Sequence, residues 1–423
     1  MLEKGSARTN ISTDHKVNAE NSSLFESLPY SDFRRWVPED SLYEEALNQL
    51  PSLWRLSEIR ALSFLSYVDS QPENAFLYNF THSRLDHSLS VALITEEILK
   101  QDRTSQKQIN LGIIAALLHD IATPAYGDAA KQVDIVNLHE EDHWWEVLDK
   151  KERSFVLHFG TREEINAIIK NQGLLGKVLD VADRIVYTMK DMDAVQLMSS
   201  NGPFNPYITE MNMIVDNNPK IGNVYQTVLV NQEEQELYFN NPNCLGAFLN
   251  LRAYLHKNLY LYPTNQGRDL LMAKAIAQIY SKDEESILSP SNLRISTDHD
   301  LMRVLAKYYK WDNSATIFHA LFNWHPEFEK FSSIDEAKKK EAELEQEDNL
   351  IVVGIKESHG FNFATEYKVK HGQLCSEFRK YDPLSAIKIE EIAQSTKGVF
   401  LFWTNTPENN SLNKLLRAIL GKN

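Results

Sequence analysis

The sequence has only two cysteines, Cys244 and Cys375, among its 423 residues. Two thiols are too few for a disulfide framework, and their spacing does not suggest a thiolate zinc site. Long apolar runs are missing too. The best run, residues 111–118, stops at His119 and is far shorter than the roughly 18 to 20 residues that span a bilayer. The amino-terminal residues also lack the apolar core of a signal peptide. We therefore expect a protein without a membrane segment in a reducing compartment, most simply the cytoplasm.

Positive charge is also scarce, because 44 Lys and Arg stand against 59 Asp and Glu, a formal net charge of −15. This balance opposes broad non-specific binding to long nucleic acid or to an anionic membrane, so any basic site must be local. The rest of the composition is that of an ordinary globular protein, with 43% hydrophobic residues, 15 glycines and 14 prolines. The length predicts two or three folded units with a sizeable core.

Apolar residues recur at intervals of three and four over most of the chain, which predicts a mainly α-helical protein. One helix is expected to begin near Ser83, and others to lie within 109–119, 163–171, 176–197, 243–262 and 268–281. The pattern becomes β-rich at 350–356, 366–378 and 399–404. The chain is therefore expected to divide into a disordered tail (1–28), a helical domain (29–330), a charged linker or helix (331–349) and a small α+β carboxyl-terminal domain (350–423).

The first candidates for a functional site are His119 and Asp120, which end an apolar helix directly before a turn-forming segment. Alone, such a pair is more often a solvated helix end than a site. Upstream, Arg84 and His87 are three apart at the start of a predicted helix, so both project toward the same side. A third predicted helix carries two carboxylates and a phenol at spacings of four, namely Asp183, Tyr187 and Asp191.

Two imidazoles and two carboxylates form a mixed nitrogen and oxygen ligand set. Such a set suits an octahedral Mn, Fe or Mg ion, or Zn at lower coordination. A metal held in this way can lower the pKa of a bound water and neutralise charge that grows on a phosphoryl oxygen. Hydrolysis of a phosphate ester is the reaction that these residue types fit best.

The order His87, then His119-Asp120, then Asp183 resembles the HD superfamily of metal-dependent phosphohydrolases, whose metal ligands follow an H, HD, D order. Other segments are similar to the dNTP triphosphohydrolase branch, which contains bacterial dGTPases and the animal SAM-and-HD-domain enzymes. These segments are LWRLSEIR (53–60), SRLDHSLSV (83–91), ADRIVY (182–187) and RAYLHK (252–257). The resemblance extends over residues 50–285 and implies a helical HD-domain core.

The resemblance implies a divalent metal ion, either Mn, Mg, Fe or Zn. Its implied ligands are His87, His119, Asp120 and Asp183. Asp180, one turn before Asp183, is the rival carboxylate.

Other residues would then contact the substrate. Arg84 and Arg184 match phosphate-facing positions. Tyr187 and Asp191 match sugar-contacting positions, with Asp191 able to accept a hydrogen bond from a 3′-hydroxyl, and Tyr254 lies in the late substrate-contacting helix.

The implied catalytic residues are Arg84, His139 and Asp128. His139 matches a histidine near the scissile phosphate, where it could contact an oxygen or move a proton. His143 lies one turn further and could be mistaken for it, but the neighbouring tryptophans favour a packing role there.

The chain also departs from the resembled branch in ways that bear on the substrate. Two further histidines usually follow the His-Asp pair, and Thr123 and Asp128 stand in their place. A hydroxyl and a carboxylate would meet a triphosphate less favourably than two imidazoles, unless Asp128 binds or orients the metal. Gly246 stands where the animal enzymes place a phosphate-facing arginine.

The sequence thus predicts an enzyme that hydrolyses deoxynucleoside triphosphates to a deoxynucleoside and triphosphate. One alternative is an HD nucleotidase or phosphodiesterase that acts on a nucleoside monophosphate, a cyclic nucleotide or another phosphoester. Another is a non-catalytic nucleotide sensor. By family analogy we expect a homo-oligomer that binds a nucleotide but neither a membrane nor long nucleic acid.

Overall fold

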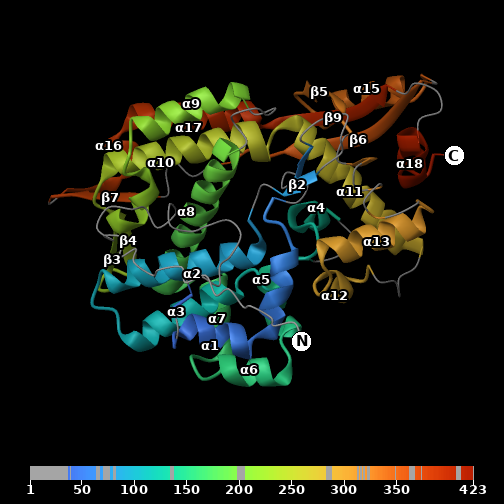
Figure 1. Ribbon diagram of the computed structural model, residues 1–423. Helices are drawn as coiled ribbons and strands as arrows, with labels where there is room; N and C mark the ends of the chain where they lie inside the picture. Colours follow the sequence, from blue (N-terminus) through green and yellow to red (C-terminus); the bar gives the residue numbers. More distant parts are fainter. Residues whose placement is uncertain are drawn as a thin grey trace, which may run out of the picture.

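The computed structural model describes residues 37–422 apart from 39, 63–66, 70–76, 80–81, 134–137, 198–204, 283–287, several positions in 312–323, 348, 362–366, 373 and 406–410. The predicted tail, residues 1–28, lies outside the described residues. The fold is mainly α-helical, as the spacing of apolar residues predicts, with small sheets that lie mostly toward the carboxyl-terminal part (Figure 1).

Three long helices form the centre of the main core: α2 (Arg84–Lys100), α3 (Gln106–Leu118) and α8 (Gly173–Leu197). α2 packs against both α3 and α8. The starts of α2 and α3 are fixed by capping boxes, in which the Ser83 and Ser105 side chains accept from the third backbone N–H of each helix. α3 is apolar on all sides because it is enclosed by its neighbours, which explains its uninterrupted hydrophobic sequence.

Other helices surround this centre, and α10 lies across the upper end of α8 (Figure 1). They are α1 (Leu42–Gln49), η2 (Pro51–Glu58), α4 (Gly127–Lys131), α5 (Glu140–Val147), α6 (Lys150–Val156), α7 (Arg162–Ile169), α9 (Asn205–Asp216), η4 (Ile221–Thr227), α10 (Pro242–Leu255), the π-helical turn η5 (His256–Tyr260), α11 (Pro263–Lys282), α12 (Pro290–Leu293) and α13 (Asp298–Tyr308). The carboxyl-terminal helices are α15 (Ile334–Leu344), α16 (Phe378–Tyr381), α17 (Pro383–Thr396) and α18 (Ser411–Ile419).

Three small sheets complete the described fold. β1 (Tyr67–Asp69) pairs with β2 (Leu77–Asn79). A second sheet has the order β3-β4-β7-β8, from β3 (Val228–Asn231), β4 (Glu236–Phe239), β7 (Lys368–His371) and β8 (Leu374–Glu377). A third has the order β5-β9-β6, from β5 (Glu327–Phe331), β9 (Gly398–Asn405) and β6 (Leu350–Ser358).

The carboxyl-terminal segment from residue 350 contains helices and strands, as predicted, but it shares a sheet with the helical part, because β7 pairs with β4. The charged stretch 331–349 contains a helix, α15, which contacts β6 and buries Ala337 and Leu344. β5, at the end of the expected helical domain, belongs to the third sheet as a partner of β9. The domain boundaries therefore stay predictions.

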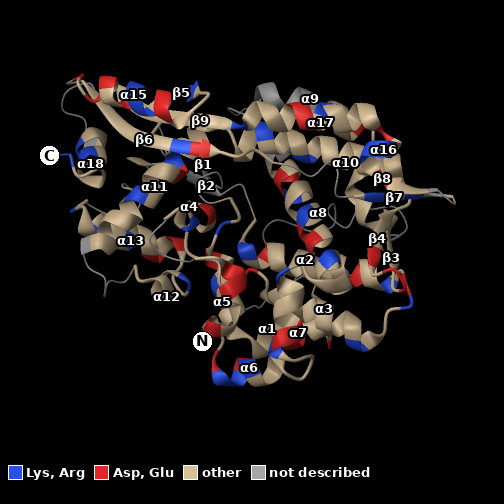
Figure 2. Cartoon of the chain, turned by 180° about the vertical axis from the view of Figure 1, so that it is seen from behind, with Lys and Arg blue, Asp and Glu red and all other residues tan. Residues whose placement is uncertain are grey.

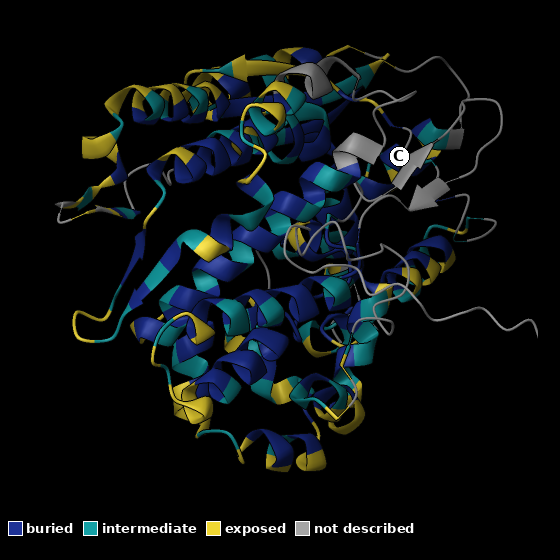
Figure 3. Ribbon diagram, turned by 60° about the vertical axis from the view of Figure 1, so that its left-hand side comes forward, coloured by how far each residue is buried: buried dark blue, intermediate teal, exposed yellow. Residues whose placement is uncertain are grey.

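Acidic and basic residues are interspersed along the helices rather than gathered by sign (Figure 2). Buried residues concentrate in the central helices and exposed ones on the outer faces (Figure 3). Within the described part of the chain, none of the helices combines the length and the apolarity needed to cross a bilayer.

Candidate functional site

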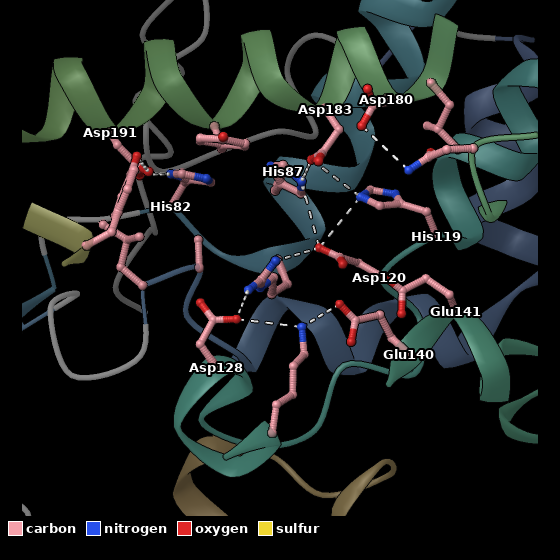
Figure 4. Close-up of a pocket in the computed structure, with 18 of the residues that line it drawn as sticks. His82, His87, His119, Asp120, Asp128, Glu140, Glu141, Asp180, Asp183 and Asp191 are labelled. Carbon is pink, nitrogen blue, oxygen red and sulfur yellow. Dashed lines mark hydrogen bonds and ion pairs between the residues drawn. The ribbon is translucent and has the colours of Figure 1, made fainter. Parts of the chain in front are cut away.

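A cavity of about 400 Å³ opens between the start of α2, the end of α3, α4, α5, the middle of α8 and η5. Its central residues are His87, His119, Asp120 and Asp183, four of the side chains that the sequence singles out. In Figure 4 their side chains converge, with Asp128 and Glu140 below them and His82 and Asp191 to one side. Residues separated by a hundred positions in the sequence thus meet at one site.

Helix geometry explains this convergence. The capping box at Ser83 starts α2 so that Arg84 and His87, three residues apart, both face the cavity. His119 is the residue that ends α3 and Asp120 follows it. Asp183 approaches them from α8, which contacts α2 and α3.

Short distances join the four central side chains. Asp183 Oδ1 lies 2.8 Å from His87 Nε2 and 3.8 Å from His119 Nε2. Asp120 Oδ2 lies 3.7 Å from the Nε2 atom of each imidazole. Ligand atoms of His87, His119 and Asp183 all fall within 4.8 Å of one another, a spacing that a single metal ion could bridge.

The orientation of His119 fits a metal ligand. Its Nδ1–H donates to the carbonyl oxygen of Ala116 at 2.7 Å, which leaves Nε2 as the nitrogen that can bind a metal ion. Nε2 is buried and has no hydrogen-bond partner among the described residues. A buried nitrogen that faces two carboxylates and a second imidazole needs a cation beside it, either a proton or a metal ion. The residues therefore fit a divalent metal of the kind that the sequence predicts.

The charges of these groups depend strongly on one another. Burial opposes ionisation of Asp183, but the neighbouring imidazoles of His119 and His87 hold its pKa far below the usual range. Burial would lower the pKa of His119, yet the nearby carboxylates of Asp120 and Asp183 raise it to about 9. Because both carboxylates stay ionised, they can act as ligands at neutral pH.

Asp120 is held from two sides. Arg84 Nη1 donates to its Oδ2 at 2.8 Å, and Thr123 Oγ1 donates to its Oδ1 at 3.3 Å. Burial would raise the pKa of Asp120, but Arg84 and His119 together hold it below the usual range. Thr123, which stands where a histidine was expected, therefore orients a carboxylate of the central cluster.

One end of the cavity carries a network of opposite charges. Arg84 Nη2 lies 4.0 Å from Asp128 Oδ1, and Lys131 Nζ lies 3.6 Å from the same oxygen and 2.5 Å from Glu140 Oε1. The Asp128 side chain is 60% exposed, whereas those of Arg84 and Lys131 are 12% and 21% exposed. Two cations thus flank the central cluster on this side.

Aromatic and acidic side chains line the other end. Tyr187 lies beside Tyr260 with ring centroids 6.0 Å apart, and its hydroxyl accepts from Arg252 Nε at 2.5 Å. Tyr260 donates to Asp191 Oδ2 at 2.6 Å. Burial raises the pKa of Asp191 to about 7, although the hydrogen bond from Tyr260 opposes this.

Three predicted site residues do not line this cavity. Arg184 follows Asp183 and projects to another side of α8, where its Nε donates to Asp180 Oδ1 at 2.9 Å and its Nη1 reaches the Tyr367 hydroxyl at 3.4 Å. Tyr254 is buried in the main core on α10. His139 is exposed directly before α5, next to the cavity-lining Glu140.

Three further positions that the sequence raises, two side chains and one glycine, lie outside the central cluster. Asp180 lines the cavity but pairs with Arg184 rather than with the two imidazoles. His143 lies 2.8 Å from Glu146, outside the cavity lining. Gly246 packs beneath the ring of Phe378, so an arginine at this position would not reach the cavity without displacing that ring.

Sequence reasoning missed several cavity residues, chiefly His82, Lys131, Glu140 and Tyr260. Signals for some of them were present. Lys131 is one helical turn beyond Asp128, and Tyr260 is four residues beyond the cavity-lining His256. His82 precedes Arg84 by two positions, in an extended segment whose direction no periodic pattern predicts.

Comparisons with known proteins agree with this geometry. Residues 84–192 match the HD domain family, a segment that includes all four central residues. No sequence match was found among curated proteins.

Solved structures share the fold. A phosphohydrolase from Bacteroides thetaiotaomicron superimposes with a TM-score of 0.62 at 14% identity, over 88% of this chain and 97% of that one. A hypothetical protein from Aquifex aeolicus does so with a TM-score of 0.60 at 15% identity, over 90% and 95%. At such identities the likeness shows the fold alone.

Proposed function

We propose that this protein is a metal-dependent phosphohydrolase that converts a deoxynucleoside triphosphate to a deoxynucleoside and triphosphate. The observation that carries the proposal is the convergence of His87, His119, Asp120 and Asp183 inside one cavity within an HD domain. Two features beside this cluster suit a nucleotide: cations at one end of the cavity, and aromatic and hydroxyl-binding groups at the other.

Different residues would bind the metal and neutralise the charge of the phosphate. The four central side chains would hold the metal, which when bound supplies an activated water and stabilises charge on the phosphoryl oxygens. Arg84 faces the same space from α2 and can neutralise charge as the transition state forms. Lys131 adds a second cation on that side, 3.6 Å from Asp128.

Substrate orientation would come from the opposite end. Tyr187 lines the wall and Asp191 can accept a hydrogen bond from a 3′-hydroxyl. His139 stays our candidate for proton transfer, because it lies next to Glu140 at the rim. Arg184 and Tyr254 have no part in this proposal.

The proposal is tested by product analysis. Purified protein is incubated with each of the four dNTPs, with Mn and Mg in separate reactions. We expect intact triphosphate and a deoxynucleoside. The His119→Ala variant should lose roughly 10²- to 10³-fold in turnover, the scale expected when an electrostatic stabiliser is removed, and should retain less metal after dialysis.

The matched control is His158→Ala, because His158 is exposed at the end of α6. Its turnover and metal content should equal those of the unmutated protein. If orthophosphate rather than triphosphate is released, the triphosphohydrolase assignment is wrong and a nucleotidase is favoured.

That second candidate, a nucleotidase or phosphodiesterase, has a specific observation in its favour. Asp128 and Glu140 place two carboxylates beside Arg84 and Lys131, so the phosphate end carries less net positive charge than two cations alone would give. A substrate with fewer phosphate charges would suit that end better.

A further inference from the structure

His82 lies in the wall of the same cavity, outside the central cluster. Its side chain is 1% exposed, it lines the cavity wall, and its ring centroid is 6.0 Å from that of His87. Neither ring nitrogen has a hydrogen-bond partner among the described residues. This is unusual, because buried polar groups normally have hydrogen-bond partners.

Asp191 faces His82 and also has a buried oxygen atom that lacks a hydrogen-bond partner within the residues that the structure describes. Tyr260 occupies its Oδ2 atom, while Oδ1 is buried and has no hydrogen-bond partner in the described chain. His82 Nδ1 and Asp191 Oδ1 are 4.0 Å apart (Figure 4). This separation is too long for a direct hydrogen bond but leaves room for one oxygen atom that bonds to both.

A hydroxyl group has the complementary chemistry. Its oxygen accepts from an imidazole N–H while its hydrogen is donated to a carboxylate oxygen. Burial lowers the pKa of His82 well below its ordinary value, and the neighbouring charges of Lys190, His87, Arg84 and Arg60 act in the same direction. His82 is therefore neutral, with one N–H to donate. A neutral donor suits a hydroxyl rather than a phosphate.

We propose that His82 is a specificity-determining residue, which together with Asp191 hydrogen-bonds to one hydroxyl of the substrate's sugar. The inference rests on the proposed function, because it takes the substrate to be a nucleotide. A sugar held here lies beside His87, so its 5′-phosphate can reach the central cluster. The pair would therefore select ligands with a 3′-hydroxyl against their dideoxy counterparts, which leave both polar atoms unpaired.

Binding is measured separately from turnover. The unmutated full-length protein in EDTA is titrated with each dNTP and with its 2′,3′-dideoxy counterpart, and dissociation constants are taken from the rise in melting temperature. We expect the dNTP to bind at least about tenfold more tightly. In His82→Phe this ratio should fall by about threefold to tenfold, the scale of one neutral hydrogen bond.

Two further variants sharpen the test. His82→Asn keeps an N–H near the position of Nδ1 and should restore most of the discrimination. His359→Phe is the control, because the His359 side chain is 83% exposed, and its ratio should equal that of the unmutated protein. If His82→Phe fails to fold, equal binding of the two ligands by the unmutated protein would still overturn the inference, and His82→Asn would still report on the N–H.

The inference is overturned if the unmutated protein binds both ligands equally or neither, or if His82→Phe weakens both to the same extent. Equal binding would indicate that a structural water, and not a substrate hydroxyl, occupies the space between His82 and Asp191. Selective binding without release of triphosphate would support the inference and contradict the proposed reaction. Turnover without discrimination would do the opposite.

Discussion

At the scale of single residues, short contacts decide what each polar side chain can do. His119 is oriented by one backbone carbonyl, that of Ala116, so its other nitrogen faces the cavity. Asp120 is oriented by Arg84 and Thr123. Such supporting contacts hold ligands in place before a metal or substrate arrives, which lowers the cost of binding.

Asp191 is a residue whose ionisation should affect stability. Burial raises its pKa to about 7 from an ordinary value of 3.8. The unfolded chain therefore loses its proton first, and stability falls as the pH rises from about 4 through 7. At 1.36 kcal/mol per pKa unit, the full effect is on the order of 4 kcal/mol.

We therefore predict that Asp191→Asn stabilises the protein, and that the gain is larger at pH 8 than at pH 5. The amide keeps an acceptor for Tyr260 and carries no charge. Thermal unfolding in EDTA measures the difference. Glu163→Gln, at an exposed position on α7, should show no such pH dependence. A gain that is the same at both pH values would show that folding does not raise the pKa of Asp191.

At the scale of elements, the turn after α3 positions the site and depends on one partly buried arginine. Arg55, on η2, donates from Nη2 to the carbonyl oxygens of Ile121 and Thr123 at 2.7 and 2.9 Å. Its Nη1 donates to the Ser296 carbonyl oxygen at 2.9 Å, directly before α13. One side chain thus joins three segments that are far apart in the sequence.

Replacing Arg55 by Met should cost about 2 to 4 kcal/mol of unfolding free energy, because buried carbonyl oxygens lose a charged donor. Urea denaturation gives the value. The matched control is Arg379→Met, since Arg379 is 52% exposed and forms a surface ion pair with Glu390 at 3.2 Å. A cost below about 1 kcal/mol, near that of a surface pair, would show that the turn is held in another way.

At the scale of the whole molecule, the carboxyl-terminal segment contributes to both large hydrophobic cores. Tyr367, Val369 and Phe378 pack in the core that contains α2, α3 and α8. Phe400 and Phe402 pack in a second core with α11 and α13. Removing this segment would expose both cores to water.

We predict that a protein truncated after residue 349 shows no cooperative thermal transition and is largely insoluble. The cause is the loss of the apolar surface that residues 350–423 bury. A control lacking residues 2–28, the predicted tail, should unfold as the full chain does. If the truncated protein melts cooperatively and keeps its turnover, residues 350–423 form a separable domain.

The sequence determined much of this protein by itself. Helical periodicity predicts α2, α3, α8, α10 and α11, because a buried helix face repeats every three to four residues. The spacing of Arg84 and His87 places both on one face, and the order of the histidines and aspartates indicates a metal site. These are local properties, set by dihedral geometry and the chemistry of each side chain.

Only the tertiary structure decided which side chains meet. The strands β3 and β4 escaped prediction because they are short, and β4 is joined to β7 from a distant part of the chain. Arg184 matched a phosphate-facing position but pairs with Asp180, whereas Lys131, one helical turn beyond Asp128, lines the cavity. His82 and Asp191 are separated by more than a hundred positions and face each other across 4.0 Å. No local pattern encodes such a pair, since it depends on how α8 packs against α2.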